Sequence, residues 1–213
     1  MDKYSDETLP QWLKWSQSLH ALARNGIAYT QNHFDRERFL EIQNIAAEIT
    51  AKYTDVDFET IRDVYDDQAG YMTPKIDVRG VVFNEGKILL VQERADHCRW
   101  TLPGGWADVQ DSPSHAVERE VYEEAGFVVH TTKLLMLHDR NKHGHTPSLF
   151  HIYKLFFRCE MVGGAATSSI ETAEIAFFAE DEIPPLSLGR TTPEQIGRIF
   201  EHYRNPGLPT DFD

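Results

Sequence analysis

The sequence predicts an α/β protein whose mixed sheet is preceded by a small all-helical domain. Up to about residue 67 the apolar residues recur at three- and four-residue spacing, which is typical of helices. After about Pro74 they fall in short runs typical of strands, interrupted by one helical stretch and followed by another. This order favours an α/β sandwich over a doubly wound sheet. We therefore expect a helical N-terminal domain over residues 1–72 and an α/β domain over residues 73–213.

Three helices are expected in the N-terminal domain. The first has apolar residues spaced over 9–23 and is expected to end at Gly26. The second has one apolar face over 39–49, with Asp35 as a suitable cap. The third is shorter and covers 57–67.

These helices carry more large apolar side chains than three short helices can hide among themselves. The residues in question are Trp12, Trp15, Leu19, Phe39, Ile42 and Ile49. Exposed apolar surface of this kind usually marks an interface, and a two-fold pairing is the commonest way to cover one. We expect a homodimer in which this domain also helps to shape the substrate pocket. Packing of the helices on their own α/β domain is the alternative.

Strand signals dominate the second domain. Two strands are expected over 76–83 and 87–92, and the turn Asn84-Glu85-Gly86 joins them into a hairpin. Further strands are expected over 127–138, 149–160 and 174–180.

Two helices are expected among these strands. One covers 113–125, because Ser112-Pro113 is a typical helix start and Gly126 a typical helix end. The other is amphipathic and covers 193–203.

Composition excludes some classes of function. The 213 residues include 21 Lys and Arg against 34 Asp and Glu, which gives a net charge of −13. A surface of this sign repels nucleic-acid backbones, so we expect no nucleic-acid duplex as a partner. A small phosphorylated substrate held through a metal ion remains compatible with it, because clustered carboxylates are what hard divalent cations bind.

Neither a membrane nor an oxidising compartment is indicated. No stretch approaches the roughly 18 consecutive apolar residues of a membrane span. The start of the chain lacks the basic and apolar segments of a signal peptide. Cys98 and Cys159 lie far apart in apolar or aromatic surroundings, which predicts buried free thiols. We expect a cytoplasmic protein.

Three carboxylates gather on the helix expected over 113–125. At 100° per residue, Glu124 lies about 40° to one side of Glu120 and Glu123 about 60° to the other. Arg119 precedes Glu123 by one turn and could hold it in place. Each like-charged pair costs about 0.2–0.5 kcal/mol. Either a bound cation offsets this repulsion or the helix simply has a solvated acidic face.

The segment around these residues resembles the Nudix box. That pattern is Gly, five residues, Glu, seven residues, then Arg-Glu-apolar-any-Glu-Glu-any-Gly-apolar. The positions that match are Gly105, Arg119, Glu120, Val121, Glu123, Glu124, Gly126 and Phe127. Asp111 stands where the pattern has its first Glu, which retains the carboxylate but puts a direct metal contact there in doubt.

The resemblance implies a Nudix α/β/α sandwich over about 74–203. Residues 1–71 and the following TPKIDVRGVVF also resemble a bacterial Nudix subgroup with a helical N-terminal extension, which includes CDP-choline and ADP-ribose pyrophosphatases. Enzymes of this family hydrolyse a nucleoside diphosphate linked to another group, so a small nucleotide is the expected substrate. The subgroup's helical extension is associated with pairing and substrate recognition.

The family also implies a divalent metal cofactor, Mg²⁺ or Mn²⁺. By that resemblance Glu120 and Glu124 are metal ligands, Glu123 is a further ligand or holds a water, and Arg119 orients the carboxylates. Gly104 and Gly105 would bring the backbone close to metal or phosphate, where a Cβ atom would intrude.

The general base is less determined by the sequence. Glu171 and Glu174 occupy a stretch before or within a late strand, where some family members carry this carboxylate. Both residues could also be exposed loop acids. Glu120 itself is the other candidate for the base.

Substrate contacts are expected from strand ends and one polar loop. Arg79 and Arg94 are candidates for phosphate or base contacts, or ordinary surface ion pairs. Trp106 could stack on a ring or anchor the core. The loop 138–145 includes His138 and Arg140, which could reach a phosphate.

Two further alternatives come from the same residues. His143 and His145 have the spacing of a zinc pair, although no cysteine accompanies them. The whole chain could be a non-catalytic sensor of nucleotide derivatives on a Nudix fold, or a scaffold. The intact Arg-Glu-x-x-Glu-Glu core favours the enzyme.

Overall fold

A computed structural model describes residues 9–68 and 70–213, and the chain divides into two compact units. One unit contains the described residues up to Pro74 together with Pro147–His151. The other contains Lys75–Thr146 and Ile152–Asp213. Residues 1–8, which carry most of the segment considered for a signal peptide, lie outside the described part of the chain.

The first unit contains the three expected helices, with two boundaries that differ from expectation. They are α1 (Gln11–Tyr29), α2 (His33–Tyr53) and α3 (Phe58–Asp66). Helix α1 continues through Gly26, because this glycine serves close packing: a Cβ there would lie 2.5 Å from the ring of Phe39 on α2. The cap of α2 is Asn32 and not Asp35, since the Asn32 side chain accepts hydrogen bonds from two backbone N–H groups of the first turn.

Small and polar side chains form much of the buried face of α2. Gln43, Ala46, Ala47 and Thr50 are buried, whereas Ile45 is 44% exposed. The expectation of a single apolar face on this helix is therefore wrong in part. Close helix packing explains the difference, because small residues let α2 approach its neighbours while bulkier ones face outward.

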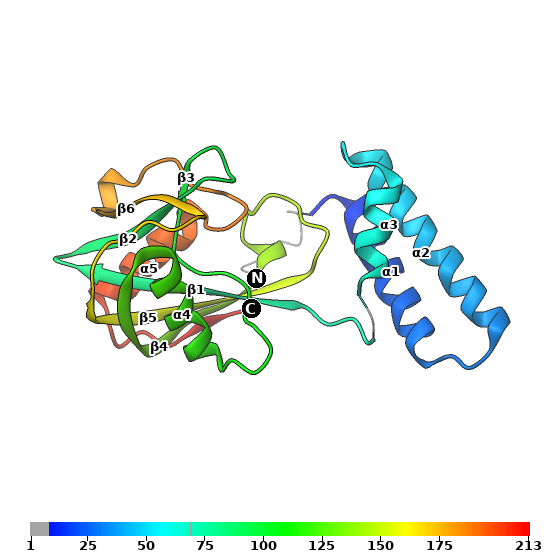
Figure 1. The fold of residues 1–213 in the computed structure, drawn as a ribbon, viewed down its shortest axis with the longest axis horizontal. Coiled ribbons are helices and arrows are strands. Elements are labelled where there is room, and N and C mark those ends of the chain that lie inside the picture. Colours follow the sequence, from blue (N-terminus) through cyan, green and yellow to red (C-terminus); the bar gives the residue numbers. More distant parts are fainter. Residues whose placement is uncertain (1–8, 69) are drawn as a thin grey trace. The chain divides into compact units, whose positions relative to one another are not determined.

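The second unit is a mixed sheet between two helices (Figure 1). Its strands are β1 (Lys75–Asn84), β2 (Lys87–Glu93), β3 (Arg99–Thr101), β4 (Phe127–Asp139), β5 (Ile152–Gly164), β6 (Thr172–Phe178) and β7 (Asp211–Phe212). In the described residues their order is β3-β2-β1-β5-β4-β7, and β6 pairs with β2. Strands β1 and β5 run parallel, whereas β4 and β5 run antiparallel. The sheet is therefore mixed, as the sequence predicts.

Helices α4 (Pro113–Ala125) and α5 (Pro193–Arg204) pack on opposite faces of this sheet. Alternate residues of each strand supply the two cores. On β1, Val78 packs in the cluster that contains Val117 and Val121 of α4. Val81, on the same strand, packs in the cluster that contains Ile199 of α5. The α/β/α arrangement places the even residues of β1 on the α4 face and the odd residues on the α5 face.

Most predicted elements of this unit are present. The hairpin turns at Glu85 and Gly86, both with positive φ, and α4 begins after Ser112 and ends at Gly126 in a left-handed cap. The short strands β3 and β7 were not expected. Strand β5 begins at Ile152, later than expected, because the preceding residues belong to the first unit.

Two expectations about the surface can be compared with the structure. Among the described residues no helix is long and apolar enough to cross a membrane. Both cysteines are free, but only Cys159 is buried. Cys98 is exposed, because it lies in the turn between β2 and β3 with a positive φ of 56°.

Candidate active site

Helix α4 carries the acidic residues of the candidate site. Its apolar residues Val117, Val121 and Ala125 face the sheet and are buried. Glu124 lies beside this apolar stripe and is only 6% exposed, whereas Glu123 is exposed on the outer side. The acidic side chains of α4 therefore range from buried, at Glu124, to exposed, at Glu123. Glu120, Glu123 and Glu124 are called the α4 carboxylates below.

Arg119 binds two of the α4 carboxylates at once. Its Nη1 donates to Glu120 Oε1 and to Glu123 Oε2, both at 2.9 Å. Its Nε donates to Asp111 Oδ2 at 3.1 Å. Its Nη2 lies 3.3 Å from Asp108 Oδ2. One guanidinium thus joins the loop before the helix to the helix itself, as the sequence predicts for the contact with Glu123.

Asp111 occupies the position at which the sequence departs from the Nudix pattern. It accepts from Arg119 and also lies 2.8 Å from His115 Nδ1. These two hydrogen bonds lower the pKa of Asp111 below its usual value. The carboxylate therefore fastens Arg119 to the loop through Oδ2, while its Oδ1 is taken up by His115.

The glycine loop closes over Glu124. Gly104 N donates to Glu124 Oε2 at 2.8 Å. Gly104 has a φ of 142°, and a Cβ there would lie 2.0 Å from Val78 O, so only glycine fits. The pKa of Glu124 is raised to about 8, mainly by burial and in smaller part by Glu93 and Glu120, while Arg79 and the Gly104 N–H oppose the shift.

Glu120 lies against the next glycine. A Cβ at Gly105 would meet Glu120 Oε2 at 2.8 Å, which is closer than real Cβ contacts come. Burial also raises the pKa of Glu120. Glu124 and Glu120 therefore both lie against the glycine loop, one accepting from Gly104 N and the other where a Cβ at Gly105 would intrude.

A divalent cation fits these residues chemically. In the described residues, Glu120 Oε2 and Glu124 Oε1 make no hydrogen bond or ion pair, although both side chains are largely buried. No three His, Cys, Asp or Glu side chains of the described chain are arranged to hold an ion by themselves. Mg²⁺ is commonly bound by one or two carboxylates, with water and substrate phosphates completing its shell. The α4 carboxylates match that partial donor set.

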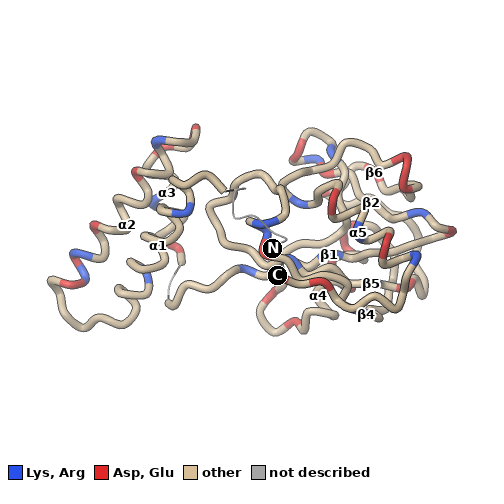
Figure 2. Tube along the Cα trace, turned by 180° about the vertical axis from the view of Figure 1, so that it is seen from behind, with Lys and Arg blue, Asp and Glu red and all other residues tan. Residues whose placement is uncertain are grey.

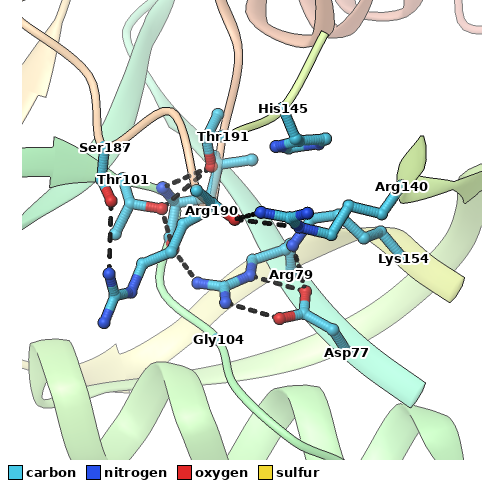
Figure 3. Close-up of polar contacts among 12 residues, drawn as sticks. Asp77, Arg79, Thr101, Gly104, Arg140, His145, Lys154, Ser187, Arg190 and Thr191 are labelled. Carbon is cyan, nitrogen blue, oxygen red and sulfur yellow. Dashed lines mark hydrogen bonds and ion pairs between the residues drawn. The ribbon is translucent and has the colours of Figure 1, made fainter. Parts of the chain in front are cut away.

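A second charged group lies on the opposite face of the sheet. Asp77 and Arg79 of β1 form a bidentate pair, with Nε to Oδ1 at 2.9 Å and Nη2 to Oδ2 at 2.7 Å (Figure 3). Lys154 Nζ of β5 donates to the same carboxylate at 2.6 Å. All three residues are at most 6% exposed. With Arg140, described next, they are called the Lys154 cluster.

Arg140 enters the same cluster from the short helix η1 (Arg140–Lys142) that follows β4. Its guanidinium donates through Nε and Nη2 to the carbonyl of Gly189, at 3.3 and 3.2 Å. It is 5% exposed, and burial lowers its pKa. Arg140 thus brings a third buried cation to a group that has a single carboxylate.

The pKa values in the Lys154 cluster reflect this imbalance. Burial lowers the pKa of Lys154 to about 7, although the charge of Asp77 opposes the shift. Burial by itself would raise the pKa of Asp77, but Arg79 and Lys154 hold this pKa well below the usual range. Asp77 is therefore ionised at neutral pH, whereas Lys154 is partly protonated.

The histidines of the loop after β4 point to separate partners. His145 Nδ1 donates to the Leu188 carbonyl at 2.8 Å, so its Nε2 accepts from Gln195 at 3.0 Å. His143 instead hydrogen-bonds Asp213 and stacks on His138 at 3.6 Å. This arrangement does not favour a zinc ion shared by the two.

His138 lies in the core and not in a solvent-facing loop. It is 5% exposed, stacks on His143 and meets the ring of Phe156 edge-on. Burial, and then the neighbouring His143, lowers its pKa to about 4. The side chain is therefore a neutral, packed histidine on the α5 face.

The remaining predicted residues lie near the ends of strands. Arg94 is exposed directly after β2, and its N–H donates to the Glu171 carbonyl at 3.0 Å. Trp106 is 47% exposed, with Lys75 Nζ 5.8 Å from its ring centre, so it is no core anchor. Glu171 and Glu174 are both exposed.

The loop that carries Glu171 is tied to α4. Thr172 Oγ1 donates to the Glu124 carbonyl at 2.8 Å, which places residues 169–172 against the end of the helix. Glu174 lies within β6, next to Ile175, which faces α4. Alternation along the strand therefore turns Glu174 toward the α5 face.

Sequence reasoning missed Asp77 and Lys154, and also Glu93. Glu93 is 5% exposed at the end of β2, and Arg190 Nε lies 3.3 Å from its Oε1. A usable signal was present: a charged residue inside an otherwise apolar strand is rarely buried unless it is paired. Asp77, Arg79 and Lys154 all stand in such positions.

Two family models match the chain, and one of them decides its family. The model described as "NUDIX domain" matches residues 73–198, more than half of the chain. The chain belongs to the Nudix hydrolase family. A second model, described as "UDP-X-like, N-terminal oligomerisation domain", matches residues 10–65. The Nudix hydrolase fold is thus joined here to a helical domain that has its own family description.

Several relatives are similar over most of this Nudix hydrolase. A Bacillus subtilis protein provisionally described as an ADP-ribose pyrophosphatase is 42% identical over 95% of this chain and 97% of its own. A solved UDP-X diphosphatase is 31% identical, with a TM-score of 0.62 over 95% of this chain and 98% of its own. A solved ADP-ribose pyrophosphatase of Streptococcus suis is 40% identical, with a TM-score of 0.60, over 66% of this chain and 100% of its own.

Proposed function

We propose that this Nudix hydrolase is a metal-dependent pyrophosphohydrolase of nucleoside diphosphates linked to another group, of the ADP-ribose or UDP-X type. The products would be a nucleoside monophosphate and a phosphorylated second group. The observation that carries the proposal is the pair of buried carboxylates, Glu120 and Glu124, each facing a glycine of the loop 104–105. The relatives described as ADP-ribose pyrophosphatases and as a UDP-X diphosphatase support the choice of substrate class.

The α4 carboxylates would hold Mg²⁺ or Mn²⁺, with Glu120 and Glu124 as ligands and Glu123 as a further ligand or water holder. A bound divalent ion offsets the charge of the pyrophosphate and activates a water molecule. Gly105 allows the Glu120 carboxylate to lie against the loop backbone, since a Cβ there would meet Glu120 Oε2 at 2.8 Å. Arg119 would fix the orientation of Glu120 and Glu123 by occupying one oxygen of each.

A carboxylate near the end of α4 would take the proton from the attacking water. Glu171 is the preferred candidate, because its loop is fastened to the Glu124 carbonyl through Thr172. Glu174 is second, because it alternates onto the other face of the sheet. Glu120 remains the alternative within the helix.

The substrate would contact residues on both sides of the glycine loop. Arg79 donates to the Leu102 carbonyl at 3.1 Å and so lies directly behind this loop. Trp106 follows this loop directly and is exposed, and Arg94 is exposed directly after β2, so each is available to contact a base or ribose. Arg140 belongs to the same binding surface through the Lys154 cluster, whereas the packed His138 would support it from beneath.

The decisive experiment is a substrate panel with product identification. The enzyme is incubated with ADP-ribose, UDP-sugars, CDP-choline and dinucleoside polyphosphates, each in the presence of Mg²⁺, Mn²⁺ or EDTA. We expect release of a nucleoside monophosphate that requires the metal. Tight binding of a compound without release of any product would instead support a nucleotide sensor.

We further propose that the N-terminal unit forms a homodimer. Trp15, Leu22 and Tyr29 follow one another at seven-residue intervals on α1 and are 58%, 65% and 72% exposed. The family model that covers these residues describes an oligomerisation domain, which supports the proposal. Light scattering on the full chain should give twice the monomer mass, and Leu22→Glu should return a folded monomer. A monomeric wild-type chain would refute the dimer.

We also propose that the domain boundary lies between residues 72 and 73. Residues 1–72 would take part in substrate recognition. A truncated chain that starts near Met72 tests both. We expect a raised KM or a changed substrate preference. A soluble truncation with wild-type kinetics would limit the N-terminal unit to assembly.

The cytoplasm is the proposed compartment. Cys98 and Cys159 are both free, and one of them is exposed, which suits a reducing environment. Fractionation of cells that express the protein tests this directly.

A further inference from the structure

The Lys154 cluster contains three buried cations and one carboxylate. Arg79, Lys154 and Arg140 are 3%, 1% and 5% exposed, and Asp77 is the carboxylate that binds the first two. Arg140 is held instead by the neutral carbonyl of Gly189. When Lys154 is protonated, these four side chains carry an excess of two positive charges. Buried charges without a counter-ion are costly, so this excess calls for an anion.

The neighbouring carboxylates do not remove the excess. Glu93 lies close enough to influence Arg79, but it is paired with Arg190. Glu124 also influences Arg79, but its carboxylate accepts from Gly104 N and forms no hydrogen bond or ion pair with Arg79, Arg140 or Lys154 in the described residues. His145, the remaining titratable neighbour of Lys154, is neutral, because burial and then Lys154 lower its pKa to about 3.

The placement of the cluster matches that of a phosphorylated substrate at the α4 carboxylates. Arg79 is the connecting residue: its Nη1 donates to the Leu102 carbonyl, and its backbone packs against Gly104. Figure 3 shows Arg140 and Lys154 running side by side above Asp77, with Gly104 on the other side of Arg79. A pyrophosphate bound at the glycine loop would therefore have metal ligands on one side and cations on the other.

We propose that Arg79, Arg140 and Lys154 form a phosphate-binding subsite in which Asp77 holds the cations together until the ligand arrives. The ligand is a phosphate group of the substrate, and Lys154 is the member of the subsite that binds a proton with it. This inference rests on the proposed function for the identity of the substrate, but the subsite itself is tested by binding alone.

Proton uptake follows from the position of Lys154. Burial lowers the pKa of this amine to about 7, so it is only partly protonated at pH 7.5. A dianionic phosphate beside it favours the charged form, so binding should draw a fraction of a proton from the solvent. Phosphate monoesters have their second pKa at about 6, so at pH 7.5 they bind as dianions and release almost no proton themselves.

The experiment is isothermal titration of the full chain at pH 7.5 with EDTA, in two buffers of different ionisation enthalpy. The probes are AMP, ribose 5-phosphate and inorganic phosphate, which distinguish the nucleotide side, the second product and a free anion. We expect at least one of the three to bind with a net uptake of a fraction of a proton. Lys154→Met should weaken that binding about tenfold and abolish the uptake.

Two further variants make the result specific. Lys154→Arg keeps the charge but cannot titrate, so it should retain binding and lose the proton uptake. Lys87→Gln, an exposed lysine at the hairpin turn, is the matched control and should change neither. In Lys154→Met the Asp77–Arg79 pair is retained, and circular dichroism checks the fold.

Failure of the subsite and failure of the proposed function can be told apart. Absence of proton uptake with all three probes, or unchanged binding by Lys154→Met, would overturn the subsite even if the enzyme hydrolyses its panel. Binding and uptake that depend on Lys154, in a protein that cleaves nothing on the panel, would retain the subsite and reject the hydrolase.

Discussion

The two charged groups of the α/β unit are opposites built on the same sheet. In the α4 carboxylates, one guanidinium, that of Arg119, binds two of the three acidic side chains. In the Lys154 cluster, one carboxylate, that of Asp77, binds two of the three basic side chains. Elsewhere acidic and basic positions are spread over many elements (Figure 2). Each group thus has an excess of one sign of charge, and we have proposed a metal ion as the ligand of the first and a phosphate as the ligand of the second.

The largest effect is expected when a charge is removed from the α4 carboxylates. Glu120→Gln or Glu124→Gln should abolish turnover, because a metal ligand is lost. Without metal, the melting temperature should stay level or rise, because like charges no longer repel. Activity assays across a Mg²⁺ titration and thermal melts in EDTA measure both.

Glu118→Gln is the control for this experiment. Glu118 lies on the same helix but accepts from Thr131 N, away from the α4 carboxylates, and glutamine retains that acceptor. Near-normal activity of either ligand variant at modest Mg²⁺ would refute the assignment.

The second effect concerns the general base. If the base lies on the loop tied to α4, Glu171→Gln should lower kcat by about 10² to 10⁴ with metal affinity unchanged. Glu174→Gln should lower it less, because that side chain faces away from α4. Steady-state kinetics and Mn²⁺ binding are measured for both. If kcat falls by less than about threefold in both variants, Glu120 becomes the candidate for the general base.

A smaller effect is expected at the loop that holds Arg119. Asp111→Ala should lower kcat/KM about tenfold, because Arg119 loses its fastening to the loop but keeps both glutamates. Asp108→Ala is the matched control, since Asp108 is largely exposed and lies 3.3 Å from Arg119 Nη2. Equal losses in the two variants would show that Asp111 has no special role.

The smallest effect is a difference in how stability depends on pH. Glu124 has a folded-state pKa of about 8 against 4.5 when unfolded, so the metal-free folded protein binds more protons between these values. Its contribution to stability therefore falls as the pH rises through this range. Glu124→Gln removes the fall, and its gain over the wild type should grow up to about pH 8.

Lys154 predicts the opposite trend. Its folded-state pKa is about 7 against 10.5 when unfolded, so the unfolded chain binds more protons in between, and this contribution rises with pH. The stability of Lys154→Met relative to the wild type should be greatest below pH 7 and decline toward pH 10. Urea unfolding at several pH values in EDTA tests both variants. If the free energy of unfolding depends on pH in the same way in the wild type and in both variants, both predictions are contradicted.

Local patterns account for the part of the site that could be predicted. Helix α4 was predictable because Ser112, Pro113 and Gly126 determine its ends. The contact of Arg119 with Glu123 followed from their four-residue spacing. The continuation of α1 through Gly26 was not predictable, because that glycine is needed for contact with Phe39 and not for a turn. Local signals cannot tell a glycine that ends a helix from one that permits close packing.

The sequence by itself determined that this protein has an acidic helix after a glycine loop, because helical periodicity places Glu120, Glu123 and Glu124 together whatever surrounds them. The Lys154 cluster was decided only by the tertiary structure. Asp77 and Lys154 are 77 residues apart, and they meet because β5 lies parallel to β1 in the register that pairs these two residues. Arg140 then joins them through the loop after β4. Strand order and register arise from the packing of the whole sheet, so the positive half of the proposed site could not be read from any local pattern.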